Sequence, residues 1–303
     1  MLDFITNHLD LGIAGAGLFV GFVVGLTGMG GGALMTPILV LLFKVPPLAA
    51  VSSDLLAAMI MKPVGGGVHW RRGSVNTELV KWLVAGSVPS AFLGVLLLKS
   101  SGSGEALQGH VKLALGLALL VVAAGLVIRP LLTRGRKPGD SLQPLIVKKL
   151  PTVLIGIAGG LVVGVTSVGS GSLMIILLLM LYPRLRLSEL VGTDLVQAIP
   201  LVASAALGHA LFGDLKLALT ASILVGSIPG VFIGAQVSSR APDSLIRPAL
   251  IVVLLGSSLK LLGTSNTVVL ATLGVFALAY GGVLFAARQR AGAAAARASL
   301  AVR

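Results

Sequence analysis

The chain of 303 residues is 56% hydrophobic and only 11% charged, whereas about 25% of the residues of a soluble domain are charged. Its formal net charge is +13 and it contains no cysteine, so disulfides, thiolate metal sites and cysteine redox chemistry are excluded. The basic residues fall in short loops between apolar segments, which is typical of the cytoplasmic loops of membrane proteins. We therefore expect a polytopic membrane protein that has the lipid bilayer, and no nucleic acid, as a partner.

Apolar segments follow one another along the chain. In order they cover residues 11–43, 48–68, 78–98, 111–131, 150–182, 188–211, 216–238, 245–262 and 267–287. Most of them have the length of about 20 residues that a membrane-spanning helix needs. The first ten residues contain no Lys or Arg, so they lack the basic region of a secretory signal, and we expect the first segment to stay in the membrane.

Two of these segments, 11–43 and 150–182, are too long for a single crossing and have glycine-rich centres. The centres are Gly-Leu-Thr-Gly-Met-Gly-Gly-Gly-Ala-Leu-Met at 25–35 and Gly-Val-Thr-Ser-Val-Gly-Ser-Gly-Ser-Leu-Met at 164–174. Inside a bilayer, broken backbone is tolerated only where protein buries it or where it lines a water-filled cavity. Interrupted segments at corresponding positions of two halves indicate the binding site of a secondary transporter.

The positive charges predict the orientation of the chain. The loop at 129–149 is basic, and the C-terminal tail carries Arg288, Arg290, Arg297 and Arg303. Both should be cytoplasmic, and the N-terminus, which carries only acidic charge, should lie outside. The remaining loops agree with this only if each glycine-rich segment returns to the side from which it entered. A full two-pass hairpin and a re-entrant hairpin satisfy this condition equally, and the expected location is the plasma (inner) membrane.

The two halves of the chain also match in sequence. Gly25 aligns with Gly164, Asp54 aligns with Asp194, and Gly-Ser-x-Pro occurs at both 86–89 and 226–229. Halves that begin on opposite sides of the membrane form an inverted repeat. We expect an all-α polytopic fold in which each half has a Gly-rich broken or re-entrant helical hairpin and three transmembrane helices. The expected units are a first repeat (1–132), a basic cytoplasmic linker (133–149), a second, inverted repeat (150–263), and an extra transmembrane helix with a basic tail (264–303).

At this point the sequence resembles a known family. Gly-x-Thr-Gly-x-Gly-Gly-Gly at 25–32, Ser-Ser-Asp at 52–54, Gly-Ser-x-Pro and a degenerate second copy are similar to the TauE/SafE-type sulfite and organosulfur exporters. These belong to the 4-toluene sulfonate uptake permease (TSUP) family. The resemblance covers about residues 11–262 and implies transport of sulfite, sulfonates or related small anions, with room for coupling to an ion gradient. Because members of the family differ in substrate and direction, it fixes neither.

The glycine-rich centres are suited to bind an oxyanion. The second arm of each hairpin begins with unpaired N–H groups and the positive end of a helix dipole, about +0.5 charge, and such ends bind oxyanions. We expect the substrate near the midplane, between the two hairpins. The predicted substrate-binding residues are Thr27, Gly28, Gly30, Gly31, Gly32, Ser53, Thr166, Ser167, Gly169, Ser170, Gly171, Ser172, Thr193 and Gln197. The alternative is that these small residues only allow helices to pack closely.

Asp54 and Asp194 each lie about one third of the way into an apolar segment. A charge at the bilayer centre costs about 2.5–3.5 kcal/mol on insertion scales, so acids there are functional candidates. They are candidates for carrying a coupling proton or another cation, since they would repel an anionic substrate. The alternative is helix capping, because Ser52, Ser53 and Thr193 with Asp194 are common N-cap types; the two roles are compatible.

Two histidines and one lysine are further candidates. His69 and His209 align across the halves and have the chemistry of proton shuttles, although both lie near loops, which favours placement at the membrane interface. Lys62 lies well inside a segment. It either snorkels to water or supplies a counter-charge for an anion or for Asp54. So few, scattered histidines predict no metal site.

These observations predict a secondary transporter of small anions that works by alternating access and is coupled to protons or another ion. The alternative is a passive anion channel of the same architecture. The sequence contains no Walker A motif and no motif of an intramembrane enzyme, so we expect neither an ATP-driven pump nor an enzyme. The glycines at 28–33 mimic a dinucleotide fingerprint, but their apolar flanks do not fit a soluble βαβ unit, and no cofactor is expected. The oligomeric state stays open.

Overall fold

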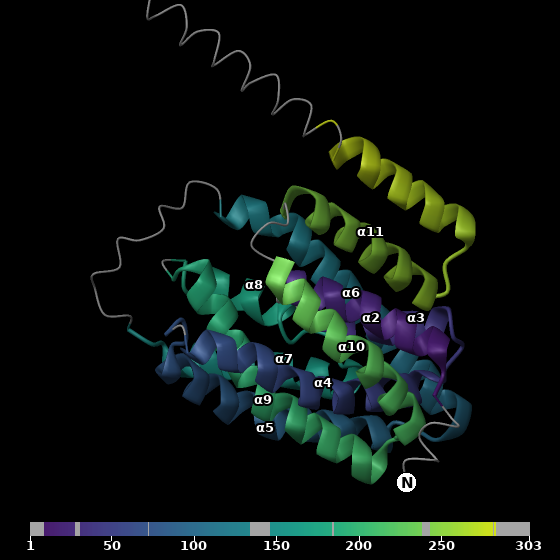
Figure 1. Cartoon of the computed structure of the whole chain (residues 1–303), viewed down its shortest axis with the longest axis horizontal. Coiled ribbons are helices and arrows are strands. Elements are labelled where there is room, and N and C mark those ends of the chain that lie inside the picture. Colours follow the sequence, from purple (N-terminus) through teal and green to yellow (C-terminus); the bar gives the residue numbers. More distant parts are fainter. Residues whose placement is uncertain are drawn as a thin grey trace, which may run out of the picture.

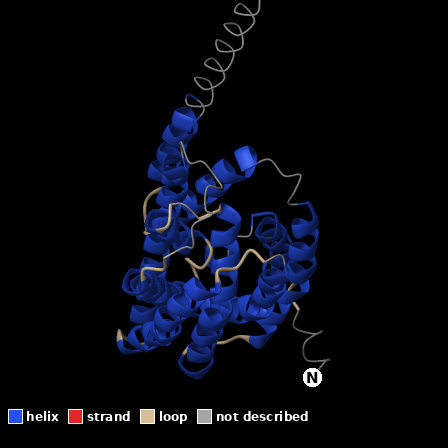
Figure 2. Ribbon diagram, turned by 90° about the vertical axis from the view of Figure 1, so that its left-hand side faces the viewer, coloured by secondary structure: helices blue, strands red, loops and turns tan. Residues whose placement is uncertain are grey.

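The structure, a computed structural model, describes residues 9–27, 31–71, 73–133, 146–183, 185–237, 243–280 and 282. Every regular element in these ranges is a helix, which confirms the predicted all-α class (Figures 1 and 2). The helices are α2 (Leu11–Thr27), α3 (Gly32–Leu41), α4 (Pro47–Arg71), α5 (Thr77–Ser100), α6 (Gly104–Thr133), α7 (Lys149–Thr166), α8 (Ser172–Leu181), α9 (Leu187–Phe212), α10 (Leu217–Val237) and α11 (Asp243–Leu261). A further apolar helix covers Asn266–Tyr280.

Five helices in the described ranges are long and apolar enough to cross a membrane. Their spans are Thr77–Ser100, Gly104–Arg129, Lys149–Thr166, Ser188–Phe212 and Leu217–Gly234. α2, α3 and α8 are apolar as well but shorter. These three helices are short because the apolar segments to which they belong are interrupted.

Both overlong apolar segments are divided into two helices at their glycine-rich centres. α2 ends at Thr27 and α3 begins at Gly32, while α7 ends at Thr166 and α8 begins at Ser172. In the second centre, Ser167 has φ 60°, and Gly169 and Gly171 have φ 117° and 110°. A right-handed helix cannot pass through residues with these angles, which glycine adopts at little cost. In the first centre, residues 28–30 lie outside the described ranges, and with them the predicted site residues Gly28 and Gly30.

α2 and α10 run parallel in close contact, and glycines make this contact possible. A Cβ atom on Gly21 would lie 2.4 Å from the carbonyl oxygen of Ser227, and one on Gly226 would lie 1.8 Å from that of Ala14. Helix backbones can approach this closely only where one helix presents small residues.

α5 and α7 form a second pair of the same kind. A Cβ atom on Gly160 would lie 2.4 Å from the carbonyl oxygen of Ser87, and one on Gly86 would lie 2.3 Å from that of Val153. In both pairs, one helix comes from the first half of the chain and the other comes from the second half. These glycines, which lie outside the two glycine-rich centres, therefore serve close packing between helices of the two halves.

α4 and α9 run antiparallel through the middle of the bundle and carry the candidate ionisable residues. Near one end, a Cβ atom on Gly192 of α9 would lie 2.4 Å from the carbonyl oxygen of Ser74. Near the other end, Ser52 of α4 contacts His209 of α9. Figure 1 shows α6 and α11 side by side, away from this centre, and Ser258 of α11 donates a hydrogen bond to the carbonyl oxygen of Gly116.

The contact between α2 and α10 predicts a clear difference between two glycines of α2. Gly21→Val would force its side chain into the backbone of α10, since the Cβ atom alone lies 2.4 Å from Ser227 O, whereas Gly15 has no neighbour within 4 Å. Overpacking typically costs about 1–3 kcal/mol. We expect Gly21→Val to lower the melting temperature in detergent by several degrees and to reduce the monodisperse fraction, and Gly15→Val to change neither. Equal melting temperatures for the two variants would contradict this packing.

Candidate functional site

The two glycine-rich centres meet in the interior of the protein. A Cβ atom on Gly32, the first residue of α3, would lie 2.0 Å from the carbonyl oxygen of Ser167 and 2.7 Å from its Oγ atom. Gly31, Gly32 and Ser167 are all buried. Two segments that are far apart in the sequence are therefore in backbone contact at the points where their helices are interrupted.

Asp54 of α4 is bonded to both interrupted segments. Its side chain is fully buried, and its Oδ2 atom accepts hydrogen bonds from Thr36 Oγ1 of α3 at 2.9 Å and from Ser167 Oγ at 2.7 Å. Its Oδ1 atom has no hydrogen-bond partner in the part of the chain that the structure describes. Thr36 was not among the predicted site residues, although it follows the first glycine-rich motif directly.

Asp194 of α9 approaches the second interrupted segment. Its side chain is 1% exposed, its Oδ1 atom accepts a hydrogen bond from Gln197 Nε2 at 3.0 Å, and the carboxylate interacts favourably with the backbone of Gly171. Gln197 Oε1 in turn accepts from Ser87 Oγ of α5 at 3.3 Å. Within the described ranges, Oδ2 of Asp194 has no partner.

Lys62 of α4 places a positive charge within electrostatic range of these two acids. Its side chain is 8% exposed, and its Nζ atom is buried without a hydrogen-bond partner among the described residues. The ammonium interacts electrostatically with Asp194 and, less strongly, with Asp54. The alternative that Lys62 snorkels to water is therefore wrong, because packing in the bundle covers its nitrogen. Burying an ammonium without a hydrogen-bond partner costs free energy. A ligand or a rearrangement that gave Lys62 a partner would remove this cost.

A small cavity adjoins the interrupted segments. It has a volume of about 20 Å³ and is lined by Thr27 at the end of α2, Gly171 and Ser172 at the start of α8, Arg129 of α6, and the apolar side chains Leu126, Ile175, Ile176 and Val191. A cavity of at least about 10–15 Å³ is needed to hold one water molecule. The space is thus sufficient for a water and too small for a sulfite or sulfonate ion.

The two acids lie inside their helices, so the helix-capping alternative is wrong. α4 begins at Pro47 and α9 begins at Leu187, about two turns before the respective carboxylate, given 3.6 residues per turn. The hydroxyl of Ser52 donates to the carbonyl oxygen of Leu48, as serines within helices commonly do.

The predicted hydroxyl donors differ in what they contact. Thr27 Oγ1 donates to Val23 O at 2.8 Å, and Thr166 Oγ1 donates to Val162 O at 2.6 Å, so both close the last turn of their own helix. Ser167 is the residue whose hydroxyl reaches Asp54. Ser170 and Ser172 are buried in the second centre, together with Gly169 and Gly171.

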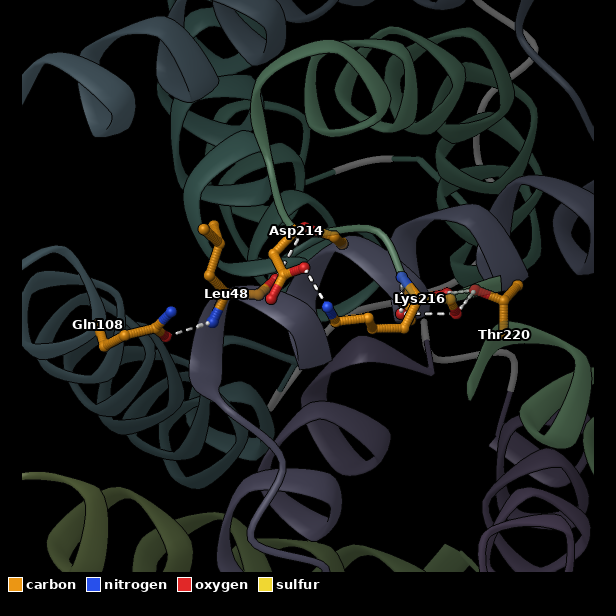
Figure 3. A network of polar contacts seen from close by, with 7 residues as sticks. Leu48, Gln108, Asp214, Lys216 and Thr220 are labelled. Atoms are coloured by element: carbon orange, nitrogen blue, oxygen red, sulfur yellow. Dashed lines mark hydrogen bonds and ion pairs between the residues drawn. The ribbon is translucent and has the colours of Figure 1, made fainter. Parts of the chain in front are cut away.

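Ser53 contacts Lys216 and Thr220, two residues at the end of the bundle where α10 begins (Figure 3). Its Oγ atom lies 3.3 Å from the carbonyl oxygen and 3.4 Å from the backbone nitrogen of Lys216, and Thr220 Oγ1 donates to Ser53 O at 3.4 Å. Lys216 also forms an ion pair of 2.8 Å with Asp214. Beside these residues, Leu48 N donates to Gln108 Oε1 at 2.9 Å. We call this group the Ser53–Lys216 contact.

Thr193 takes the equivalent place at the opposite end of the bundle. Its Oγ1 atom accepts a hydrogen bond of 3.0 Å from the backbone N–H of Asn76, next to the close approach of Gly192 to Ser74. His69, which is half-buried, contacts Ser74 Oγ through Nδ1 at 3.0 Å. We call this group the Thr193–Asn76 contact. The structure thus separates Ser53 and Thr193 from the central residues with which they were predicted.

His209 is buried in the bundle and lies in the last turn of α9. Its exposed fraction is 0%. Nε2 donates to the carbonyl oxygen of Gly164 at 2.8 Å, and Nδ1 lies 2.8 Å from Ser52 Oγ. His209 therefore links α9 to α7 and α4, near the residues of the Ser53–Lys216 contact.

Comparisons with known proteins agree with these features. The family described as "Sulfite exporter TauE/SafE" matches residues 13–261. The chain is 42% identical over 248 residues to the "Probable membrane transporter protein YjnA" of Bacillus subtilis (strain 168), covering 81% of this chain and 97% of the relative. It is 25% identical over 231 residues to the "Probable membrane transporter protein YdhB" of the same organism, covering 76% and 91%.

A third relative, the "Probable membrane transporter protein YunE" of Bacillus subtilis (strain 168), is 41% identical over 90 residues, which are 29% of this chain and 31% of the relative. No solved structure matches the chain. The family match over most of the chain, the named membrane transporters among its relatives and the apolar helices support a multi-pass membrane transporter that is not an enzyme. The chain belongs to the TauE/SafE sulfite exporter family.

Proposed function

We propose that this protein is a secondary transporter of small oxyanions, with sulfite and organic sulfonates as the substrate class. The observation that carries the proposal is the meeting of the two glycine-rich centres next to a buried ammonium that has no hydrogen-bond partner among the described residues. An oxyanion fits this combination of groups, because it can bond to an ammonium, to hydroxyls and to helix N-termini at once. The family name adds sulfite as the specific candidate.

In this proposal the anion binds between the two interrupted segments. Lys62 supplies the counter-charge, and the backbone at Gly31, Gly32 and 169–171 supplies N–H groups. Ser167, Ser170 and Ser172 add hydroxyls. Asp54 and Asp194 are the candidates for carrying a coupling ion. Because the adjoining cavity holds about 20 Å³, the described conformation is a closed one, and substrate entry requires the segments to separate.

The helix contacts support an inverted repeat. Gly21 packs against Ser227, and the aligned residues of the other half, Gly160 and Ser87, pack in the same way. Likewise, Ser53 contacts the backbone of Lys216, and the aligned Thr193 contacts the backbone N–H of Asn76. Equivalent contacts that exchange the two halves are what a pseudo-two-fold axis in the membrane plane would produce.

These two end contacts support alternating access. In the orientation that the basic loops predict, Asn76 lies on the cytoplasmic side, and Lys216 lies outside. The Thr193–Asn76 contact would then close the cytoplasmic entrance and the Ser53–Lys216 contact the external one, one helical turn or less from the acids on the same helices. Opening one contact while the other stays closed gives the substrate site access to one side at a time. A passive channel would have no need for two such closures.

The first test is anion flux into proteoliposomes. We expect saturable uptake of sulfite or of a sulfonate such as isethionate or sulfoacetate, and none into empty liposomes. Ser167→Ala removes the hydroxyl bonded to Asp54, and we expect a loss of at least about tenfold in kcat/KM, or ~1.4 kcal/mol. Gly32→Val should abolish flux because its side chain would displace Ser167. Ser100→Ala, on the exposed end of α5, is the matched control and should leave flux unchanged.

Both site variants must be compared as folded protein, judged by size-exclusion profile and melting temperature. Normal flux by folded Ser167→Ala and Gly32→Val would contradict the location of the site. An absence of saturable flux for every anion tested would contradict the proposed function itself.

The second test uses the absence of cysteine from the chain. A single Ser170→Cys variant reports access to the centre when membrane-impermeant thiol reagents are added from either side. Adding Thr193→Val, which removes the acceptor for Asn76, should increase the labelling rate from the cytoplasmic side and decrease it from the outside. Adding Ser53→Ala should do the opposite. A channel predicts no such reciprocity, so rates that rise or fall together on both sides would refute alternating access.

A further inference from the structure

We infer that the protein moves each monovalent anion together with one proton, so that transport carries no net charge. Lys62 holds the anion, and the pair of Asp54 and Asp194 holds the travelling proton. This inference rests on the proposed function and adds to it the identity of the coupling ion, the stoichiometry and the residues responsible.

Three buried charged groups of α4 and α9 are each incompletely paired. Asp54 is 0% exposed, Asp194 1% and Lys62 8%. One oxygen of each carboxylate, and the nitrogen of the ammonium, have no hydrogen-bond partner in the described part of the chain. The ammonium interacts with both carboxylates but is not hydrogen-bonded to either. Each of the three groups therefore has an atom free to take up a proton or a ligand.

The charges of these groups determine how many protons accompany an anion. A net charge in a buried site of low dielectric costs several kcal/mol, so the neutral arrangement is strongly favoured. Without a substrate, the single positive charge of Lys62 balances one carboxylate, and the other carboxyl carries a proton. With a monovalent anion on Lys62, the anion replaces that carboxylate as the partner of the ammonium, and both carboxyls carry protons. Loading therefore takes up one anion and one proton, and unloading releases both.

A proton fits this site better than a metal cation. Among the described residues, no group of three or more His, Asp or Glu side chains is placed to hold a metal ion. Lys62 already interacts electrostatically with both carboxylates, and its charge would repel a second cation. Oδ2 of Asp54 is occupied by the hydroxyls of Thr36 and Ser167, which leaves one oxygen, enough for a proton but few ligands for a metal.

The helices around the site contain few other ionisable groups. α3, α8 and α10 have no charged side chain and no histidine. On α9, His209 is bonded to Gly164 and Ser52, and Glu189 lies in the first turn. On α6, Arg129 lines the neighbouring cavity, but the charge that acts on Asp54 and Asp194 is that of Lys62 and not that of Arg129, so Arg129 does not enter the charge balance of the two carboxylates. On α4, His69 and Arg71 lie in the last turn. The proton that accompanies each anion is thus assigned to the two aspartates.

The test is a measurement of proton movement during anion flux in proteoliposomes. Isethionate is the probe, because a sulfonate stays ionised at neutral pH and brings no proton of its own. A dye inside the vesicles reports pH, labelled anion reports flux, and potassium with valinomycin sets the membrane potential. We expect uptake to acidify the lumen with one proton per anion, and the initial rate to be the same at either sign of the potential. An inward gradient of one pH unit should accumulate the anion about tenfold, the equilibrium ratio for one-to-one coupling.

Saturable flux that responds to membrane potential and leaves the internal pH unchanged would overturn the inference and leave the proposed function intact. So would flux that requires a sodium gradient. If neither isethionate nor sulfite shows saturable flux, the proposed function fails as well. The two failures are therefore distinguishable in the same vesicles.

Variants give a pattern that a purely structural role would not produce. Asp194→Asn leaves one carboxyl, which is ionised when the site is empty and protonated when it is loaded, so coupling should stay one to one. The double variant Asp54→Asn with Asp194→Asn has no carboxyl left, so flux should become independent of pH and dependent on potential. Lys62→Met should raise the KM for the anion by at least tenfold. Glu105→Gln, exposed at the start of α6, is the matched control and should keep normal coupling.

Potential-independent flux by the folded double variant, with protons still moving, would show that other groups carry the proton and would overturn the assignment.

Discussion

The structure depends on one constraint: an interrupted helix inside a bilayer must have its exposed backbone groups covered by protein. In the second centre, positive φ angles at Ser167, Gly169 and Gly171 end one helix before the next begins. Gly32 brings the other interrupted segment into backbone contact with Ser167. The hydroxyl of Ser167 bonds to Asp54, and Asp194 interacts with the backbone of Gly171. Glycines that let α2 lie on α10, and α7 on α5, hold both interrupted segments in place. The site is therefore a consequence of how the breaks are buried.

Much of this could be predicted from sequence, because the signals are local. Glycine clusters in the middle of apolar runs of excessive length predicted the ends of α2 and α7 and the starts of α3 and α8, and they also indicated close packing between helices. The bounds of α4 and α9 were predicted to within a few residues, because turn residues flank both: proline is tolerated in the first turn of a helix, as at Pro47. The place of the acids on these helices follows directly from those bounds.

What could not be predicted depends on tertiary packing. The apolar residues around Lys62 in the sequence are compatible with a lysine that reaches water and with a buried lysine. Which of the two is present depends on how deeply α4 is packed among the other helices, and the sequence does not contain this information. Ser53 and Thr193 directly precede the acids, yet a helix turns by about 100° per residue, and their hydroxyls contact the opposite ends of the bundle. Thr27 and Thr166 were expected to face a ligand, but a hydroxyl in the last turn of a helix can instead bond to the carbonyl group four residues earlier.

The two halves differ in sequence at one position of the proposed site, and this difference determines the charge of the site. Asp54 and Asp194 correspond to each other, but the residue of α9 that corresponds to Lys62 is Val202, which is 1% exposed and packs in an apolar cluster. A lysine in both halves would give two positive charges for two carboxylates, and the empty site would be neutral without any proton. A lysine in one half leaves one carboxyl that only a proton can neutralise. The difference between the halves at this single position therefore gives a site that takes up a proton together with an anion, where two lysines would give two buried ion pairs.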